Sequence, residues 1–379
     1  MTRKITAIII SILILLASGQ CYALGLSASS AIVIEKLTGD VVYEKNAHKR
    51  MPMASTTKIM TAICALENGN TADMVKVHPS AVNVEGSSMY LGYDEVISLE
   101  DLVYGLMLAS GNDAAVAIAV HISGSVENFA ALMNETAAKI GANDTSFKNP
   151  NGLDEEGHYT TASDLAKITR YALSNETFAR IVSSWSKKVP WQGKDYDRQL
   201  KNHNKLLKMY DGCNGVKTGF TKKSGRCLVS SAVRDGVEVI AVTLNAPNDW
   251  NDHTVMLDYA FESLENKQII KADDYVRFVK VLNGASERIK TVAKSNFYIP
   301  VKNGITPEIE MHYNIPDIIE APVDFGQVIG KVEIYRNGEL LGAVDVISDE
   351  SCAWVEQKSF FKYIKKIFTS FVLMHRRTC

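Results

Sequence analysis

The sequence predicts an α/β (α+β) domain over residues 24–265, in which helices flank an antiparallel sheet, followed by a small all-β domain and a C-terminal amphipathic helix. Strand-like runs stand at both ends of the first domain, with helical runs between them. Short alternating runs between glycine and proline turns fill residues 272–352 and predict the all-β domain. A chain of 379 residues is long enough to hold both domains.

Residues 1–23 are predicted to be an export signal. Arg3 and Lys4 supply the positive start, and residues 5–17 are almost wholly apolar. Small residues at the two positions that a signal peptidase inspects place the cleavage after Ala23. The alternative is a retained membrane anchor, for which the apolar run is short.

Five strands are predicted for the sheet of the first domain. Residues 30–36 and 41–44 form a hairpin around the turn Thr38-Gly39-Asp40. Asp235-Gly236 is a tight-turn dipeptide and signals a second hairpin. We expect the sheet to join the first hairpin to three late strands. These late strands are residues 215–221, 226–234 and 237–244.

Helices are predicted between the two groups of strands. Ser98 precedes one helical run as a cap, and Glu100 and Asp101 occupy its first turn, where acidic residues are favourable. The character of the sequence changes after residue 180, and residues 189–207 are expected to be extended segments and loops. The other helical runs are residues 54–66, 113–120, 126–140, 163–173 and 249–264.

The second domain and the tail differ in pattern. Asn337-Gly338 signals a hairpin within the all-β domain. In residues 354–379, aromatic and aliphatic residues recur at helical spacing, and lysines fall largely on the other side. Such a basic amphipathic helix is suited to lie in a membrane interface. We expect residues 355–379 to hold the exported protein at the outer face of the cytoplasmic membrane. Packing on the protein's own β domain is the alternative.

Composition and charge exclude several classes of function. The chain is 46% hydrophobic with a formal net charge of -2, and nothing in it indicates a nucleic-acid partner. Its cysteines and histidines lack the spacing of a metal site, and no phosphate-binding loop is present, so no cofactor is expected. Cys213 and Cys227 flank one predicted strand, and a disulfide between them is left open.

The first chemical motif is Ser55-Thr-Thr-Lys58. Residues three apart on a helix lie on one face, one turn apart. A serine hydroxyl becomes a nucleophile when a base takes its proton, and a neighbouring amine can be that base. The same spacing recurs at Ser184/Lys187 and Ser359/Lys362, so the pattern alone does not identify the nucleophile.

Two further motifs single out Ser55. Ser110-Gly-Asn112 joins two predicted helices, and Lys217-Thr-Gly219 lies on a predicted strand. In the predicted chemistry, Ser55 forms an acyl-enzyme and Lys58 takes its proton, because burial near Lys217 favours a neutral amine. Ser110 passes the proton to the leaving amine.

The remaining motif residues are predicted to bind substrate. Asn112 holds a substrate amide, and Lys217 with Thr218 holds a carboxylate. Gly219 leaves room for substrate along the strand edge. The backbone N–H groups of Ser55 and Phe220 form the oxyanion hole. Each residue also has a plain structural alternative, as a helix cap or a surface charge.

The chain resembles the low-molecular-mass penicillin-binding proteins, which are serine-type D-alanyl-D-alanine carboxypeptidases. The resemblance implies a β-lactamase/transpeptidase-like fold, cleavage of the terminal D-alanine from peptidoglycan stem pentapeptides, and acylation by penicillins and other β-lactam antibiotics. Phe220 stands where some members have histidine, and in this the chain resembles the Gram-positive branch, some of whose members act in sporulation; a vegetative or a sporulation role is left open. Besides the three motifs, the resemblance rests on residues 149–153, 161–166, 204–207 and 215–221.

Three other functions are left open. A D,D-endopeptidase on peptide cross-links would use the same residues. A β-lactamase would need an added glutamate, and no Glu-x-x-Leu-Asn stretch lies between Asn112 and Lys217, so penicillin is expected to form a lasting adduct on Ser55. A non-catalytic wall-binding protein would leave the ordered motifs unexplained. His203 is a further candidate to face the active site.

Overall fold

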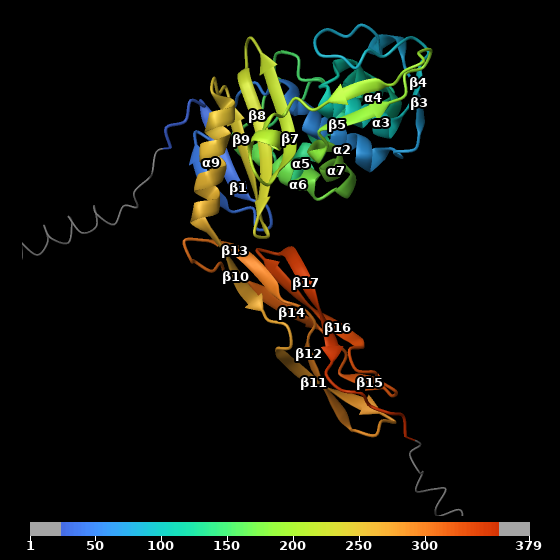
Figure 1. Cartoon of the computed structure of the whole chain (residues 1–379), viewed down its shortest axis with the longest axis vertical. Coiled ribbons are helices and arrows are strands. Elements are labelled where there is room, and N and C mark those ends of the chain that lie inside the picture. The colour runs from blue at the N-terminus through green and yellow to red at the C-terminus, as the bar shows by residue number, and fades with distance from the viewer. Residues whose placement is uncertain (1–23, 356–379) are drawn as a thin grey trace, which may run out of the picture. The chain divides into compact units, whose positions relative to one another are not determined.

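The computed structural model describes residues 24–355 and divides the chain into two units between Ser263 and Leu264 (Figure 1). A helix-flanked sheet followed by an all-β unit confirms the predicted fold class. The predicted C-terminal amphipathic helix lies outside the described residues. The second unit starts at Leu264, before the predicted start at 272, because the intervening residues form a strand that pairs within that unit.

The first unit is built on a five-stranded sheet in the order β2-β1-β9-β8-β7, antiparallel throughout. The predicted joining of the first hairpin to the late strands occurs where β1 pairs with β9. Strand β7 lies at one edge, so one side of its backbone is open to other partners. The strands are β1 (Ser30–Glu35), β2 (Val41–Lys45), β7 (Cys213–Thr221), β8 (Gly225–Arg234) and β9 (Val237–Leu244).

Helices cover both faces of this sheet (Figure 1). Helix α9 packs on β8 and β9 from one side, and the remaining helices form the larger layer on the other side. Side-chain oxygens of Ser98, Ser125 and Thr161 cap α3, α5 and α6 by accepting from backbone N–H groups. The helices are α2 (Lys58–Asn68), α3 (Leu99–Leu108), α4 (Asn112–Ser123), α5 (Val126–Ile140), α6 (Ala162–Leu173), α7 (Glu176–Ser183), α8 (Leu206–Met209) and α9 (Asp249–Ser263).

The segment between α6 and β7 is more ordered than predicted. Residues 180–207 hold the end of α7, the hairpin of β5 (Ser186–Val189) and β6 (Arg198–Lys201), and the start of α8. Arg198 fixes the hairpin, since its guanidinium makes two hydrogen bonds of 2.6 Å to the buried carboxylate of Glu95. Two short elements of the helical layer, β3 (Met74–Lys76) and β4 (Val96–Ser98), pair with each other.

The second unit consists of two sheets. One pairs β10 with β13, and the other has the order β14-β16-β17-β12-β11-β15, in which only β11 and β15 are parallel. The predicted Asn337-Gly338 hairpin joins β16 and β17. The strands are β10 (Leu264–Ile270), β11 (Tyr275–Leu282), β12 (Arg288–Ala293), β13 (Phe297–Lys302), β14 (Glu310–Asn314), β15 (Ile318–Glu320), β16 (Val328–Arg336) and β17 (Glu339–Ser348).

The cysteines of the described residues are free thiols. Cys213 lies opposite Ala232 in the β7–β8 ladder, whereas Cys227 lies opposite Gly219, so the two thiols are well separated along the strands. The disulfide between Cys213 and Cys227, which the sequence left open, is therefore not formed in the structure. Within residues 24–355, no single helix is long and apolar enough to cross a bilayer; only α4 and α5 together, bent by 84° at their junction, have the length and composition.

Candidate active site

Ser55 sits in a 3-10 turn, η1 (Ala54–Thr57), immediately before α2. Ala54 has a left-handed backbone, with φ of 47°. Thr57, the last residue of the turn, holds it closed. The Thr57 hydroxyl donates to the Ala54 carbonyl at 2.8 Å and lies 2.9 Å from His158 Nε2. Because His158 Nδ1 accepts from a backbone N–H, its Nε2 carries the proton and donates to Thr57. Burial lowers the pKa of His158 to about 4, which keeps this arrangement neutral.

Lys58 is the first residue of α2 and is fully buried. Its Nζ lies 2.9 Å from Ser55 Oγ, 2.7 Å from Asn112 Oδ1 and 2.6 Å from the Asn151 carbonyl oxygen. Burial, and then the charge of Lys217, lower the pKa of Lys58 well below its ordinary value. A serine hydroxyl and an amine biased toward neutrality are thus within hydrogen-bond distance.

The second motif lies in the tight connection between α3 and α4. Ser110 has a left-handed backbone, with φ of 58°, and Asn112 begins α4. The Asn112 amide nitrogen Nδ2 donates to the Glu85 carbonyl at 2.6 Å, which turns Oδ1 toward Lys58. One N–H hydrogen and one lone pair of this amide remain for a substrate. In the described structure Asn112 therefore positions Lys58, a contact that the two motifs do not indicate by themselves.

Lys217 links the second motif to the third. It is buried on β7, and its Nζ lies 3.1 Å from Ser110 Oγ and 3.0 Å from the Thr218 carbonyl oxygen. Burial lowers the pKa of Lys217 to about 7. The structure thus brings Ser55, Lys58, Ser110, Asn112 and Lys217 together from three separate parts of the chain. They form two hydrogen-bonded groups, one around Lys58 and one between Lys217 and Ser110, and the charge of Lys217 acts on Lys58.

Gly219 allows β7 to pass close to the turn that carries Ser55. A Cβ atom at Gly219 would lie 3.0 Å from the Ser55 nitrogen and 3.1 Å from the Met53 carbonyl oxygen. The edge strand and η1 are therefore in backbone contact, with the Ser55 N–H beside the strand. Phe220, the next residue, is 64% exposed, so its side chain makes little contact with the core.

Residues 149–152 supply a part of the site that the three motifs do not predict. The Asn151 carbonyl accepts from Lys58, and Asn149 Oδ1 accepts from the Gly152 N–H at 2.8 Å. Gly152 has φ of 86°, and a Cβ there would lie 2.0 Å from the Ala54 carbonyl oxygen. Asn-Pro-Asn-Gly signals a turn, but a turn signal does not say what the turn packs against.

Replacing Gly152 with alanine is expected to displace η1 and lower kcat/KM at least about 100-fold, since small misplacements of a nucleophile are that costly. Gly141→Ala is the matched control. Gly141 has a similar φ of 79°, but nothing lies within 4 Å of its added Cβ. It should cost only about 1–2 kcal/mol of stability from the left-handed backbone. Thermal melting and turnover of both variants test this, and equal activity of the two would contradict it.

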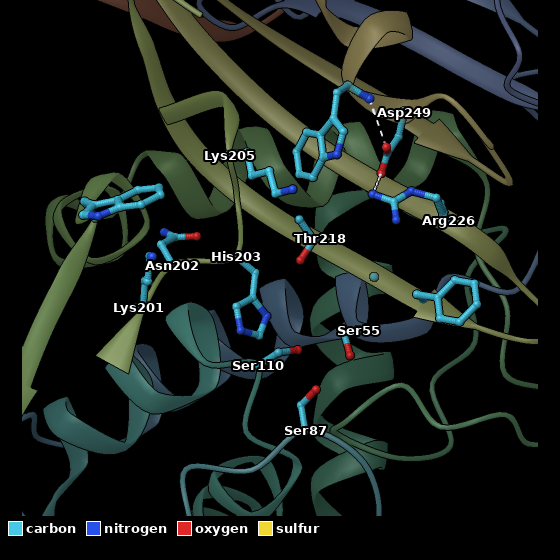
Figure 2. A pocket seen from close by; sticks show the side chains of 14 residues that line it. Ser55, Ser87, Ser110, Lys201, Asn202, His203, Lys205, Thr218, Arg226 and Asp249 are labelled. Carbon is cyan, nitrogen blue, oxygen red and sulfur yellow. Dashed lines mark hydrogen bonds and ion pairs between the residues drawn. The ribbon is translucent and has the colours of Figure 1, made fainter. Parts of the chain in front are cut away.

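A cavity of about 580 Å³ opens onto Ser55. Ser55, Ser87 and Ser110 lie on one side, Thr218 and His203 near the middle, and Lys205, Arg226 and Asp249 beyond them (Figure 2). His203, left as a candidate, does line the cavity; partial burial and the Lys217 charge lower its pKa. Residues 24–355 hold no group of three His, Cys, Asp or Glu side chains placed to bind a metal ion.

Two family models match the chain. The D-alanyl-D-alanine carboxypeptidase family matches residues 19–248, and the C-terminal domain of penicillin-binding protein 5 matches residues 264–353. The second match starts where the second unit of the structure starts.

Individual relatives point the same way. The chain is 34% identical to D-alanyl-D-alanine carboxypeptidase DacF of Bacillus subtilis, over 97% of this chain and 98% of the relative. It is 30% identical to DacC of Escherichia coli, over 88% of this chain and 86% of the relative. Penicillin-binding protein 5 of Haemophilus influenzae superposes with a TM-score of 0.62 at 27% identity, covering 87% of this chain and 98% of that chain.

A variant of the Streptomyces K15 DD-transpeptidase superposes with a TM-score of 0.60 at 32% identity, covering 63% of this chain and 99% of that chain. The family resemblance predicted from the three motifs is confirmed by these matches. The chain therefore belongs to the D-alanyl-D-alanine carboxypeptidases, a family of serine-type hydrolases.

Proposed function

We propose that this enzyme removes the terminal D-alanine from peptidoglycan stem pentapeptides through an acyl-enzyme on Ser55. The observation that carries this proposal is the buried Lys58 amine, 2.9 Å from Ser55 Oγ and biased toward neutrality. A neutral amine at that distance can accept the hydroxyl proton as the serine attacks.

In the acylation step, Ser55 Oγ forms a bond to the carbonyl carbon of the penultimate residue, and the amide C–N bond breaks. The serine proton moves to Lys58, and a proton reaches the leaving nitrogen through Ser110, whose hydroxyl is held by Lys217 at 3.1 Å. The backbone N–H groups of Ser55 and Phe220 stabilise the oxyanion, and removing one such donor typically costs about 10²–10³ in rate. Water then attacks the ester, a C–O bond to Ser55 breaks, and Ser55 regains its proton.

The binding residues are assigned to opposite ends of the scissile bond. Lys217 and Thr218 hold the terminal carboxylate, and Asn112 holds an amide on the acyl side with its remaining donor or acceptor. The substrate lies along the open edge of β7, where Gly219 brings strand and nucleophile close together.

Incubation with a peptide ending in D-Ala-D-Ala tests the proposal. Released D-alanine, abolished by penicillin, is the expected result, and no release would overturn it.

The enzyme is also proposed to form a lasting penicillin adduct. Among the described residues that line the cavity, the one carboxylate is Asp249, and it is paired with Arg226 at 2.9 Å. No carboxylate therefore stands free at the ester to activate water, as a β-lactamase requires. The opened β-lactam ring remains attached to the acyl group and occupies the leaving side, so hydrolysis is slow.

The activity should have a pH optimum and should fall at higher and at lower pH. Lys217 is charged below its pKa of about 7 and loses that charge as the pH rises through this value, which weakens carboxylate binding. kcat/KM for an acid-ended peptide should then fall about tenfold per pH unit. On the acid side kcat/KM falls as Lys58 gains a proton. A substrate ending in an amide is the control: it should lack the alkaline limb, and an identical limb would contradict the assignment.

The exported protein is proposed to act at the outer face of the cytoplasmic membrane. The basic amphipathic pattern of residues 355–379 supports attachment to the membrane surface. Basic side chains are attracted to anionic lipid headgroups there, and aromatic side chains are buried in the interface.

Deleting residues 355–379 is expected to move the protein from the membrane fraction to the soluble fraction. Fractionation and immunoblotting measure this, and an unchanged membrane fraction would refute the role of these residues as the membrane anchor.

A further inference from the structure

Three large aromatic side chains of the first unit are open to water near the active-site cavity. Tyr90 is 72% exposed and Tyr196 is 58% exposed, whereas Trp191 is half-buried. Tyr90 belongs to the loop that precedes β4, and the other two belong to the connection between β5 and β6. Exposed apolar groups that gather at one place on a surface mark sites of interaction.

One buried arginine connects these three residues. The Arg198 guanidinium donates to the Tyr90 carbonyl oxygen at 3.0 Å and lies over the ring of Trp191, 4.7 Å from its centroid. Trp191 and Tyr196 meet edge to face, with ring centroids 5.8 Å apart. Because Arg198 is also paired with the buried Glu95, the loop and the hairpin are held together before any ligand arrives. A surface fixed in advance binds with a smaller loss of entropy. We call Tyr90, Trp191 and Tyr196 the aromatic platform.

The aromatic platform is continuous with the cavity on two elements. Ser87 and Lys201 line the cavity (Figure 2). Tyr90 follows Ser87 by three residues, and Arg198 precedes Lys201 by three residues on β6, distances that an extended chain covers in about 10 Å. The acyl part of a stem pentapeptide has four residues, which reach about 13 Å when extended, and its N-terminal end is attached to a sugar of the glycan strand. The stem peptide is therefore long enough to leave the cavity and bring its sugar to the platform.

The chemistry of the platform suits a neutral sugar. Aromatic faces pack against the C–H groups of a sugar ring, while the hydroxyl groups of the sugar need hydrogen-bond partners at the edge. Asp195 and Asp197 flank Tyr196 and are exposed, and among the described residues their carboxylates have no partner, so they are free to accept from hydroxyl groups. Residues 191–197 hold one lysine and two aspartates, and this negative balance disfavours an anionic membrane surface as the ligand.

We propose that the aromatic platform is a glycan-binding surface, and that the enzyme holds the sugar strand there while Ser55 acts on the end of the attached stem peptide. This inference rests on the proposed function, since it takes the sugar and the cleaved peptide to belong to one substrate. The contact is non-covalent and changes no step of the hydrolysis. Its consequence is a preference for stem peptides that are attached to sugar over the same peptides in free form.

Two substrates that share one pentapeptide test the surface. The first is the free pentapeptide ending in D-Ala-D-Ala, and the second carries a disaccharide of N-acetylated amino sugars at its N-terminal end. The wild type is expected to prefer the second in kcat/KM by about threefold to tenfold, because one or two aromatic contacts contribute about that much. In Tyr90→Ala/Tyr196→Ala the ratio should fall to about one. A wild-type ratio of one, or a ratio that survives the double substitution, would overturn the surface.

Tyr90→Phe/Tyr196→Phe is the matched control, because it keeps both rings and removes only the hydroxyl groups. It should keep the wild-type ratio, and a ratio of one in this variant would overturn packing of the rings against sugar. A general loss of activity affects both substrates equally and cancels in the ratio.

Binding without catalysis separates this inference from the proposed function. In the Ser55→Ala protein, titration with an oligosaccharide of N-acetylglucosamine that carries no peptide should change the tryptophan fluorescence. The chain has four tryptophans, so Trp191→Phe in the same background identifies the signal and should remove it. No change, or a Trp191-dependent change with anionic lipid vesicles alone, would overturn the glycan surface. Failure of the wild type to release D-alanine from acyl-D-Ala-D-Ala would instead overturn the proposed function, and would leave the titration as it is.

Discussion

Ser55→Ala is expected to lower turnover of a D-Ala-D-Ala peptide by about 10⁶-fold, because removing the nucleophile of a serine hydrolase typically costs that much. The variant should also lose labelling by a fluorescent penicillin, since no acyl-enzyme can form. Release of D-alanine and an electrophoretic gel of labelled protein measure the two effects.

Ser184→Ala is the matched control for this change. Ser184 and Lys187 repeat the spacing of the motif, but Ser184 Oγ donates to the Arg180 carbonyl at 2.8 Å and lies at the end of α7. Its loss should leave labelling intact. A Ser55→Ala protein that still carries Ser55-independent label at wild-type intensity would refute the assignment of the nucleophile.

Lys58→Met is expected to have the second largest effect, a loss of about 10²–10⁴ in kcat, the usual contribution of a general base. Methionine is similar in length and apolar, so it suits a fully buried position. Lys187→Met is the control, because Lys187 lies over the ring of Tyr104, 4.7 Å from its centroid, and takes no part in the hydrogen-bonded group around Lys58.

The double variant Ser55→Ala/Lys58→Met sharpens this test. If Lys58 acts only through Ser55, the double variant should be no slower than Ser55→Ala alone, because groups that act as a unit are strongly non-additive. Independent, multiplying losses in single-turnover assays would show that Lys58 does something other than activate Ser55.

The sequence was sufficient to predict the sheet because its strands carry local signals. Asp235-Gly236 marks a tight turn, and alternating apolar residues flank it on β8 and β9. Helix α7 was missed because it has only eight residues, of which Phe178, Ile181 and Val182 are buried. In so short a run, helical and extended periodicity are hard to distinguish, and packing against β7 decides the outcome.

The residues of the candidate site also fall into those that could be predicted from the sequence and those that could not. Ser55, Lys58 and Lys217 could be predicted because their side chains carry the chemistry. The carbonyl oxygens of Asn151 and Glu85, which receive hydrogen bonds from Lys58 and Asn112, could not, since every residue has such a group and only the fold selects it. His158 was also missed, because its partner Thr57 lies about a hundred residues away in the sequence.

The pairing of β1 with β9 has a consequence for biosynthesis. Ser30 lies opposite Leu244, so the centre of the sheet joins the first strand of the unit to its last. Contacts between such distant parts of a chain form slowly, because a long loop must close first. The unit therefore stays open until Val237–Leu244 has been synthesised, and N-terminal fragments lack a completed sheet. For a chain predicted to be exported, a sheet that is completed only by its last strand keeps the polypeptide unfolded during transport. It also delays formation of the active site around Ser55 until the whole unit has crossed the membrane.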